Sequence, residues 1–223
     1  MGDILTIAID GPAGAGKSTI AKRLAKDYEI VYVDTGAMYR SVALYMMEHH
    51  IDLDIEQAVV DALDQVHIRI VYKDQVQHIY LNEEDVTQKI RQQSVGEGAS
   101  KVSAYLPVRK KMVMMQQEMA KMTSLVMDGR DIGTHVLTDA KVKIFLNADV
   151  MIRAKRRYNE LVEKGESADL NVIADEIRER DHRDMNREHA PLIQAQDAHL
   201  LDTSKMSIDD VVHAIKKIIE MRR

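Results

Sequence analysis

The sequence contains no cysteine among its 223 residues, which excludes disulfide bonds and thiolate metal sites. It also lacks an excess of positive charge, because 31 Lys and Arg face 36 Asp and Glu and the net charge is −5. Proteins dedicated to nucleic-acid polymers usually carry a basic surface, so this class is disfavoured. The nine histidines show no metal-ligand spacing, and the chain has no internal repeats or low-complexity linker.

Long hydrophobic runs are missing as well. No apolar stretch approaches the roughly 20 residues that cross a bilayer. The first residues lack a basic region and the first apolar run stops at Asp10, so we expect neither a signal peptide nor an anchor. With 45% hydrophobic residues, the chain can bury one sizeable core and a small appended domain. We expect a cytoplasmic globular protein, and we expect it to be a monomer.

The most informative motif follows an apolar run at residues 4–9, which is typical of a strand buried on both faces of a parallel sheet. Residues 11–18 then match the phosphate-loop pattern G-x-x-x-x-G-K-[ST] in full, and helix-forming sequence follows at residues 20–27. A Gly-rich turn without function is the alternative, and the strand–loop–helix context disfavours it. The predicted ATP-binding residues of the loop are Gly11, Pro12, Ala13, Gly14, Ala15, Gly16, Lys17, Ser18 and Thr19.

The chemistry of ATP explains these residue types. Glycines let backbone N–H groups point inward around an anion, and the following helix adds the positive end of its dipole. Lys17 can reach the outer phosphates, where it is a predicted catalytic residue, and Ser18 offers a hydroxyl to Mg²⁺.

Two later strands are predicted to end in polar clusters. The strand at residues 30–33 leads into Asp34-Thr35-Gly36, and Arg40 lies in the first turns of a helix predicted over residues 37–49. Ligands of open α/β sheets gather at such strand ends, although Arg40 could instead be a solvated surface arginine.

The strand at residues 125–127 runs into Asp128-Gly129-Arg130-Asp131. An Asp at this place suits a carboxylate that acts on Mg²⁺ or on its water ligands, so we assign that role to Asp128. A charged turn with internal ion pairs is the alternative.

Between these strands lies antiparallel material at residues 61–91. Val66, Ile68, Ile70 and Tyr72 alternate with polar residues, a turn is predicted at residues 73–75, and a returning strand at residues 76–81. The insert could cover a substrate or be a structural embellishment.

A helix is then predicted around residues 96–100, and another begins near Pro107. Its stripe of apolar side chains is predicted to be core packing rather than a binding groove, with Arg109 off the stripe. The stripe consists of Val108, Met112, Met115, Met119 and Met122.

After a strand at residues 142–146, two charged helices are predicted at residues 149–163 and 170–188. Their low apolar content favours a mobile lid over core. The second helix carries Arg180, Arg183, Asp184 and Arg187 on one face, with Asp184 able to pair with Arg180. Clustered guanidinium groups suit phosphate oxygens, although a solvated face is the alternative. On the first helix we expect Arg153 and Arg157 to contact ATP. A short strand at residues 199–202 and an amphipathic helix, with Ser207 and Asp210 as a capping pair, complete the chain.

The site favours one reaction class. The chain has no N-K-x-D base-reading motif of the guanine-nucleotide switches. Phosphoryl transfer between two anions needs positive charge around both, and a closing lid that excludes water. These features indicate a small-molecule kinase with an acidic acceptor. A kinase of the adenylate or shikimate type and a non-catalytic nucleotide-binding module remain the alternatives.

The sequence resembles the bacterial cytidylate kinase family (CMP/dCMP kinases) over nearly its whole length. The matching segments are GPAGAGKST at residues 11–19, DTGAMYR at 34–40, DGRDIGT at 128–134, VKIFLNA at 142–148 and RERDHRDMNREHAPL at 178–192. DGRDIGT and the arginine run are the specific ones, since phosphate loops are widely shared. Thr35 stands where some family members have serine, which keeps the hydroxyl.

The resemblance implies transfer of the γ-phosphoryl group of ATP to CMP or dCMP, with Mg²⁺. It implies an α/β fold of a P-loop kinase with a five-stranded parallel sheet, in one unit with three parts. These are a core at about 1–36, 124–150 and 192–223, a nucleoside-monophosphate-binding subdomain at about 37–123, and a lid at about 151–191.

It also implies roles for individual residues. Arg40, Arg130 and Arg187 clamp the acceptor phosphate, and Ser100, Arg109 and Asp131 read cytosine. Arg180 and Asp184 contact the ribose, with Arg180 also near the transferred phosphate, and Thr35 binds the substrate. Cytosine offers an N4 donor to a carboxylate such as Asp131, while its O2 and N3 can accept from Arg109.

Overall fold

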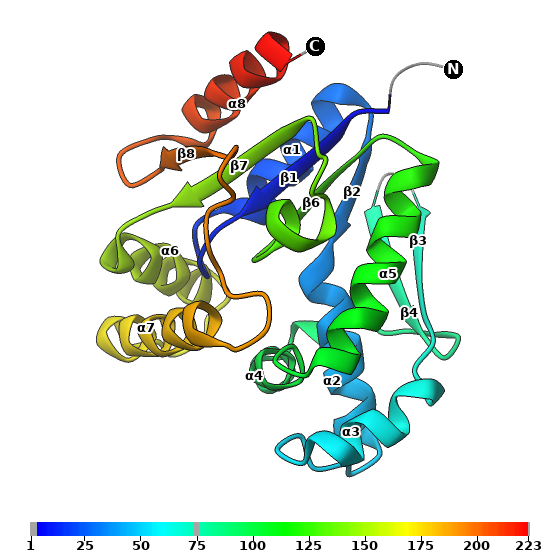
Figure 1. Ribbon diagram of the computed structural model, residues 1–223. Helices are drawn as coiled ribbons and strands as arrows, with labels where there is room; N and C mark the ends of the chain where they lie inside the picture. Colours follow the sequence, from blue (N-terminus) through cyan, green and yellow to red (C-terminus); the bar gives the residue numbers. More distant parts are fainter. Residues whose placement is uncertain (1–3, 74–75, 223) are drawn as a thin grey trace. The chain divides into compact units, whose positions relative to one another are not determined.

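The chain forms two compact units, which are described separately (Figure 1). The computed structural model describes residues 4–73 and 76–222. Within those ranges the first unit covers residues 4–32 and 122–222, and the second covers residues 33–73 and 76–121. None of the helices in these ranges is long and apolar enough to cross a membrane.

A five-stranded sheet has the strand order β2-β6-β1-β7-β8. Its strands are β1 (Thr6–Asp10), β2 (Val31–Asp34), β6 (Leu125–Gly129), β7 (Val142–Asn147) and β8 (His199–Asp202). The central strand β1 pairs in parallel with β6 and β7, which places Ile7 opposite both Val126 and Val142. Because Ile7 and its neighbours are covered on both faces, the apolar run without alternation is explained. The predicted α/β fold with a five-stranded parallel sheet is confirmed.

Two helices supply the apolar cover of this sheet in the first unit. They are α1 (Lys17–Tyr28), directly after the phosphate loop, and α8 (Ile208–Arg222), whose buried face includes Val212 and Ile215. The predicted capping pair before α8 is confirmed. The backbone N–H of Ser207 donates to Asp210 Oδ2 at 3.0 Å, and the N–H of Asp210 donates to Ser207 Oγ at 3.2 Å.

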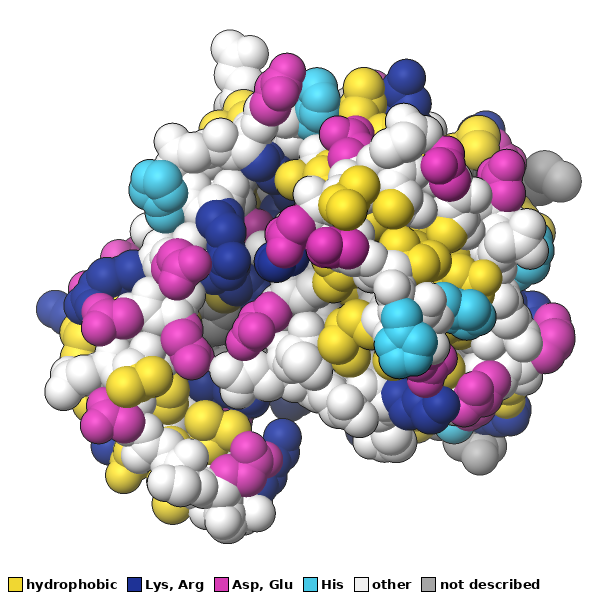
Figure 2. Space-filling view, turned by 90° about the horizontal axis from the view of Figure 1, so that it is seen from below, with side chains coloured by type: hydrophobic (Ala, Val, Ile, Leu, Met, Phe, Trp, Pro, Cys, Tyr) yellow, Lys and Arg dark blue, Asp and Glu magenta, His cyan; other side chains and the backbone are white. Residues whose placement is uncertain are grey.

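The two charged helices are α6 (Val150–Glu163) and α7 (Leu170–Asn186). Asp149 caps α6 by accepting from the N–H of Met151 at 2.8 Å. The helices pack side by side around a small apolar cluster of their own, which includes Ala154 and Ile177. Figure 2 shows basic and acidic side chains intermixed over the left-hand part of the molecule, where these helices lie. Their outer faces are therefore largely charged, as the sequence predicts, although Val162 and Val172 are also exposed.

The second unit is built around α2 (Thr35–Glu48), whose residues Met38, Val42 and Met46 are fully buried. The predicted hairpin is confirmed as β3 (Ile68–Lys73) and β4 (Val76–Leu81), with Ile70 opposite Ile79. The turn predicted at residues 73–75 includes residues 74 and 75, which lie outside the described residues. The remaining elements are α3 (Glu56–Ala62), η1 (Leu63–Gln65), β5 (Glu84–Asp85), η2 (Lys89–Arg91), α4 (Gln93–Val102) and α5 (Leu106–Met122). Of these, α3, η1, β5 and η2 are not predicted from the sequence, because all four are short.

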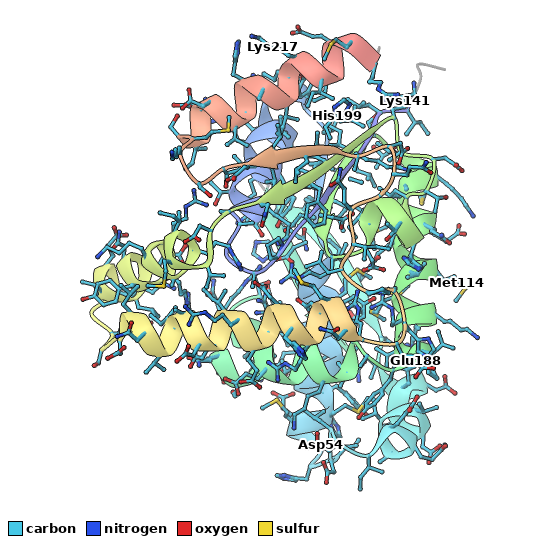
Figure 3. The ribbon with its side chains drawn as sticks, turned by 60° about the vertical axis from the view of Figure 1, so that its left-hand side comes forward. Asp54, Met114, Lys141, Glu188, His199 and Lys217 are labelled. Carbon is cyan, nitrogen blue, oxygen red and sulfur yellow. The ribbon has the colours of Figure 1, made fainter. Side chains whose placement is uncertain are left out.

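The methionine stripe of α5 is core packing along most of its length. Val108 and Met112 are fully buried, and Met115 and Met119 pack against the core of the second unit. The prediction is wrong for Met122, which is 83% exposed at the end of the helix. On the outer side of α5, Met114 points away from the unit (Figure 3).

Gly11 generates a prediction about stability. Its φ is +147°, and a Cβ built there would lie 2.0 Å from the carbonyl oxygen of Leu146 in β7. The backbone of a neighbouring strand cannot yield easily, so Gly11→Ala should lower the free energy of unfolding by about 3 kcal/mol. Gly165→Ala is the control, because its φ is +75° but no atom lies within 4 Å of a Cβ. It should cost about 1 kcal/mol in urea denaturation. Equal losses would contradict the steric explanation.

Candidate functional site

The phosphate loop joins β1 to α1, and Lys17 is the first residue of that helix. The Lys17 side chain is only 6% exposed, and its Nζ donates to the carbonyl oxygen of Pro12 at 2.7 Å. Burial lowers the pKa of Lys17 well below its ordinary value, and the nearby charge of Arg130 lowers it further. A phosphate bound at the loop would raise the pKa of Lys17 again, because a nearby negative charge stabilises the protonated amine. The surroundings of Lys17 therefore favour the binding of an anion.

Ser18 and Asp128 lie together at the ends of α1 and β6. Ser18 Oγ donates to Asp128 Oδ2 at 2.9 Å. Hydroxyl and carboxylate oxygens are the hard ligands that Mg²⁺ takes, so the pair fits the ion. Nowhere in residues 4–73 and 76–222 do three His, Asp or Glu side chains group closely enough to hold a metal. A magnesium ion here would therefore need phosphate oxygens and water as its other ligands.

Tyr32, at the second position of β2, holds the same carboxylate from the other side. Its hydroxyl donates to Asp128 Oδ1 at 2.9 Å, and the residue is buried. Both oxygens of Asp128 are thus oriented by hydrogen bonds. The sequence analysis missed Tyr32, since a tyrosine inside an apolar strand has the pattern of a core residue.

Arg130 and Asp184 form the next contact of the network. Arg130 Nε donates to Asp184 Oδ2 at 2.7 Å, which joins the loop after β6 to helix α7. Burial alone would raise the pKa of Asp184, but the charges of Arg130, Arg180 and Arg187 hold it below its ordinary value. Arg180, the partner that the helix spacing predicts for Asp184, is among the charges that lower this pKa. Asp184 therefore interacts with arginines from two segments, the loop after β6 and its own helix.

Arg187 directly follows α7, next to Glu188, which Figure 3 labels at the end of the helix. Its Nη2 lies 3.4 Å from Asp131 Oδ1, and its Nε donates to the carbonyl oxygen of Ala190 at 2.7 Å. Asp131 is only 5% exposed. The residue expected to bind the acceptor phosphate and one expected to read the base are thus adjacent in the first unit.

Asp10, at the end of β1, is a further buried carboxylate that the sequence analysis did not select. It accepts from the N–H groups of Ile132 and Gly133, both at 2.7 Å. These residues begin η3 (Ile132–Val136), which directly follows Asp131. Burial raises the pKa of Asp10 to about 6, although the two N–H donors oppose the shift. Asp10 therefore ties the base of the phosphate loop to the segment that carries Arg130 and Asp131.

Of the two lid arginines expected to contact ATP, Arg153 is buried and adjoins the phosphate loop, where its Nη1 donates to the carbonyl oxygen of Ala13 at 2.8 Å. Arg157 is half-buried, and its Nη1 lies 3.3 Å from Glu160 Oε2. The two arginines therefore have different surroundings although they are one helical turn apart.

The remaining predicted residues belong to the second unit. Thr35 is buried at the start of α2, where Asp34 caps the helix by accepting from the N–H of Ala37 at 2.9 Å. Arg40, further along α2, approaches α4, because a Cβ built on Gly96 would lie 3.9 Å from its Nε.

Ser100 and Arg109 come close together through Ser103. Ser103 Oγ donates to the carbonyl oxygen of Ser100 at 2.9 Å, and Arg109 Nη1 donates to the carbonyl oxygen of Ser103 at 3.1 Å. The guanidinium group also lies over the ring of Tyr39, at 5.8 Å. Arg109 was placed off the apolar stripe, yet it is buried, because these partners satisfy its charge inside the unit.

The raised pKa of Asp10 predicts a pH dependence of stability. Between its ordinary value of 3.8 and about 6, the folded protein keeps a proton that the unfolded chain has released. The retained proton stabilises the folded protein fully below about pH 4. As the pH rises through about 6 this part of the unfolding free energy is lost, by at most about 3 kcal/mol. The unfolding free energy of wild type minus that of Asp10→Asn should fall over this range. With the exposed control Asp139→Asn the difference should stay flat. A flat difference for Asp10→Asn would contradict the assignment.

Comparison with known proteins adds independent information. The sequence model of the family described as Cytidylate kinase matches residues 7–221. The cytidylate kinase of Caldicellulosiruptor bescii is 48% identical over 217 residues, covering 97% of this chain and 95% of that protein. The cytidylate kinase of Leuconostoc mesenteroides is 50% identical over 214 residues, covering 96% of each chain.

Solved structures support the fold alone. An uncharacterized protein from Eubacterium ventriosum gives a TM-score of 0.54 at 16% identity, over 97% of this chain and 98% of that one. A sugar kinase from Janibacter sp. gives 0.50 at 10% identity, over 98% and 95%. The family match extends over nearly the whole chain and includes the phosphate loop, the segment after β6 and the arginine-bearing helix. The chain therefore belongs to the cytidylate kinase family.

Proposed function

We propose that the chain transfers the γ-phosphoryl group of ATP to CMP or dCMP, giving ADP and CDP or dCDP. Family membership and about 48–50% identity to curated cytidylate kinases support this activity. The structural observation that carries the proposal is a network of polar and charged side chains at the ends of β1 and β6. Its members are Lys17 of the phosphate loop and the pairs Ser18–Asp128 and Arg130–Asp184, of which Lys17, Asp128 and Asp184 are buried.

In this proposal the donor is bound by residues 11–19. The N–H groups of the loop and the start of α1 bind the phosphates, and Lys17 contacts the outer ones. Ser18 holds Mg²⁺, with Asp128 bound to the ion directly or through water. When bound, the ion neutralises charge on the β- and γ-phosphate oxygens.

The proposed acceptor contacts follow from the chemistry of CMP. Arg130 and Arg187, together with Arg40, bind the acceptor phosphate, since planar guanidinium groups match phosphate oxygens. The base-reading residues are Asp131, Ser100 and Arg109, with Asp131 accepting from the N4 amine of cytosine. The sugar contacts are Arg180 and Asp184, and Thr35 adds a hydroxyl to the substrate site.

Catalysis then needs positioning and charge neutralisation more than proton transfer. The two nucleotides are both polyanions, so Lys17, Arg130, Arg180 and Arg187 offset their repulsion and stabilise the charge that develops on the transferred group. The polar helices α6 and α7 act as the lid that excludes water from the reaction. A monomeric state and a cytoplasmic location remain predictions.

The decisive experiment is an acceptor panel. Purified protein with ATP and Mg²⁺ should form ADP with CMP and dCMP, and kcat/KM for AMP and shikimate should be lower by at least about 100-fold. A coupled assay of ADP release measures this. Faster turnover with AMP or shikimate would overturn the choice of acceptor. Tight ATP binding without acceptor-dependent ADP release would instead support a non-catalytic module.

Asp131 allows a test of the base-reading role. Asp131→Ala removes the acceptor for the N4 amine of cytosine, so KM for CMP should rise by about 10- to 100-fold. KM for ATP should stay within about twofold, because the donor contacts remain. The exposed Asp139→Ala, eight residues further along the same segment, is the control and should leave both values unchanged. Equal losses for CMP and ATP would argue against the role.

A further inference from the structure

A buried ion pair joins the lid helices to the phosphate loop, and neither the motif analysis nor the proposed reaction accounts for it. Arg153 of α6 and Asp181 of α7 approach to 2.6 Å between Nη1 and Oδ2. Their side chains are only 4% and 9% exposed. Breaking such a pair is costly, because the remaining charge is left buried without a counter-ion.

Both members also bind the backbone of one loop residue, Ala13. Arg153 Nη1 donates to the carbonyl oxygen of Ala13 at 2.8 Å, and the N–H of Ala13 donates to Asp181 Oδ1 at 3.3 Å. In addition, Arg153 Nε donates to the carbonyl oxygen of Ala148 at 2.9 Å, just before α6. The ion pair thus binds both the N–H group and the carbonyl oxygen of Ala13.

The close approach of α6 at Gly14 is a second, independent sign of this contact. A Cβ built on Gly14 would lie 3.2 Å from Cβ of Arg153 and 3.7 Å from its carbonyl oxygen. Gly14 also has a φ of +75°, which favours glycine. The loop is therefore packed against the first turn of α6.

The position of Asp181 on α7 extends the effect to the charge network. Arg180 precedes it directly, and Asp184 lies one helical turn further along the helix and holds Arg130 at 2.7 Å. Because these residues share one helix, the contact of Asp181 with the phosphate loop also determines the positions of Arg180 and Asp184 relative to that loop.

We propose that Arg153 and Asp181 are positioning residues of the ATP site: the pair fixes the phosphate loop at Ala13 and sets the register of α7 against it. This inference rests on the proposed donor site. It gives Arg153 a role through the loop backbone, in place of the phosphate contact expected from its charge.

The charges make the two single variants unequal. Arg153→Met leaves the Asp181 carboxylate without its neutralising partner beside the place of the triphosphate, so repulsion adds to the loss of the loop contact. Asp181→Asn also loosens the loop, but the extra positive charge of Arg153 offsets part of the loss. The double variant restores neutrality without the ion pair.

The experiment measures the Kd of a non-hydrolysable ATP analogue with Mg²⁺ by calorimetry. Arg153→Met should raise Kd by about 30-fold or more, and Asp181→Asn by at most about fivefold. The double variant should bind at least about threefold more tightly than Arg153→Met. KM for CMP should rise by a smaller factor than Kd for the analogue in all three, since α7 carries two of the proposed sugar contacts but the direct loss is at the phosphate loop. Arg153→Lys should restore most of the affinity for the analogue.

Two matched controls separate loop positioning from general destabilisation. Arg156→Met removes another half-buried arginine of α6, whose Nη2 donates to the carbonyl oxygen of Thr203 at 2.8 Å, away from the phosphate loop. Asp175→Asn removes an exposed carboxylate of α7 that is paired with Arg178. Neither should change Kd for the analogue by more than about twofold, even if the melting temperature falls.

Several outcomes would overturn the proposal. These are unchanged analogue binding in folded Arg153→Met, equal effects of the two single variants, or an equal loss for CMP. If Arg153→Met does not fold, Arg153→Lys and Asp181→Asn decide the question. The proposal is then supported if Arg153→Lys binds the analogue normally and Asp181→Asn binds it about two- to fivefold more weakly. If wild type binds the analogue but fails the acceptor panel, the proposed reaction is wrong while this test remains informative.

Discussion

The structure depends on placing positive charges with little exposure to solvent beside one another. Lys17, Arg130 and Arg180 would repel each other in a medium of low dielectric constant. Carboxylates of the same unit offset this repulsion, and each is itself held in place, as Asp128 is by Ser18 and Tyr32. The cations are therefore held in position by the fold itself. In a preorganised electrostatic site of this kind, no free energy is spent on arranging the charges when the reaction occurs.

The carboxylates differ in environment, and this separates their roles. Asp184 keeps a low pKa because three arginines outweigh its burial. Asp10 has a raised pKa because burial outweighs its two N–H donors. Asp184 therefore serves as a counter-ion for these arginines, whereas Asp10 serves as a hydrogen-bond acceptor for the backbone. An aspartate can thus either balance nearby positive charge or hold a loop through hydrogen bonds, depending on the groups around it.

The sequence predicts the elements well where a pattern is long or a motif has a fixed geometry. The parallel sheet, the hairpin strand Val76–Leu81 and the last strand His199–Asp202 are all confirmed. The association of Ser18 with Asp128 could also be anticipated, since Asp128 lies near the end of β6 and Ser18 follows the neighbouring parallel strand β1. The short elements α3 and β5 carry too few residues for a period to be visible.

What the sequence does not reveal is which partner satisfies each buried charge. Asp181 and Asp10 look like ordinary acidic residues, because their partners are backbone groups 168 and 122 or more residues away along the chain. Arg109 looks like a surface residue because it lies off the apolar stripe of its helix, and its partner Ser103 is only six residues away. Such pairings depend on the packing of whole helices, which periodicity does not encode. The role of each residue toward the nucleotides remains a prediction.

The hydrogen bonds of Asp10 have a consequence for redesign of the enzyme. One carboxylate supports the N–H groups of Ile132 and Gly133, so the segment that ends at Asp131 is anchored from the first strand of the sheet. The side chains before this anchor, including Asp131, can be exchanged without removing either hydrogen bond. Any replacement segment must still present two consecutive free N–H groups to Asp10, and a proline at either position would detach it.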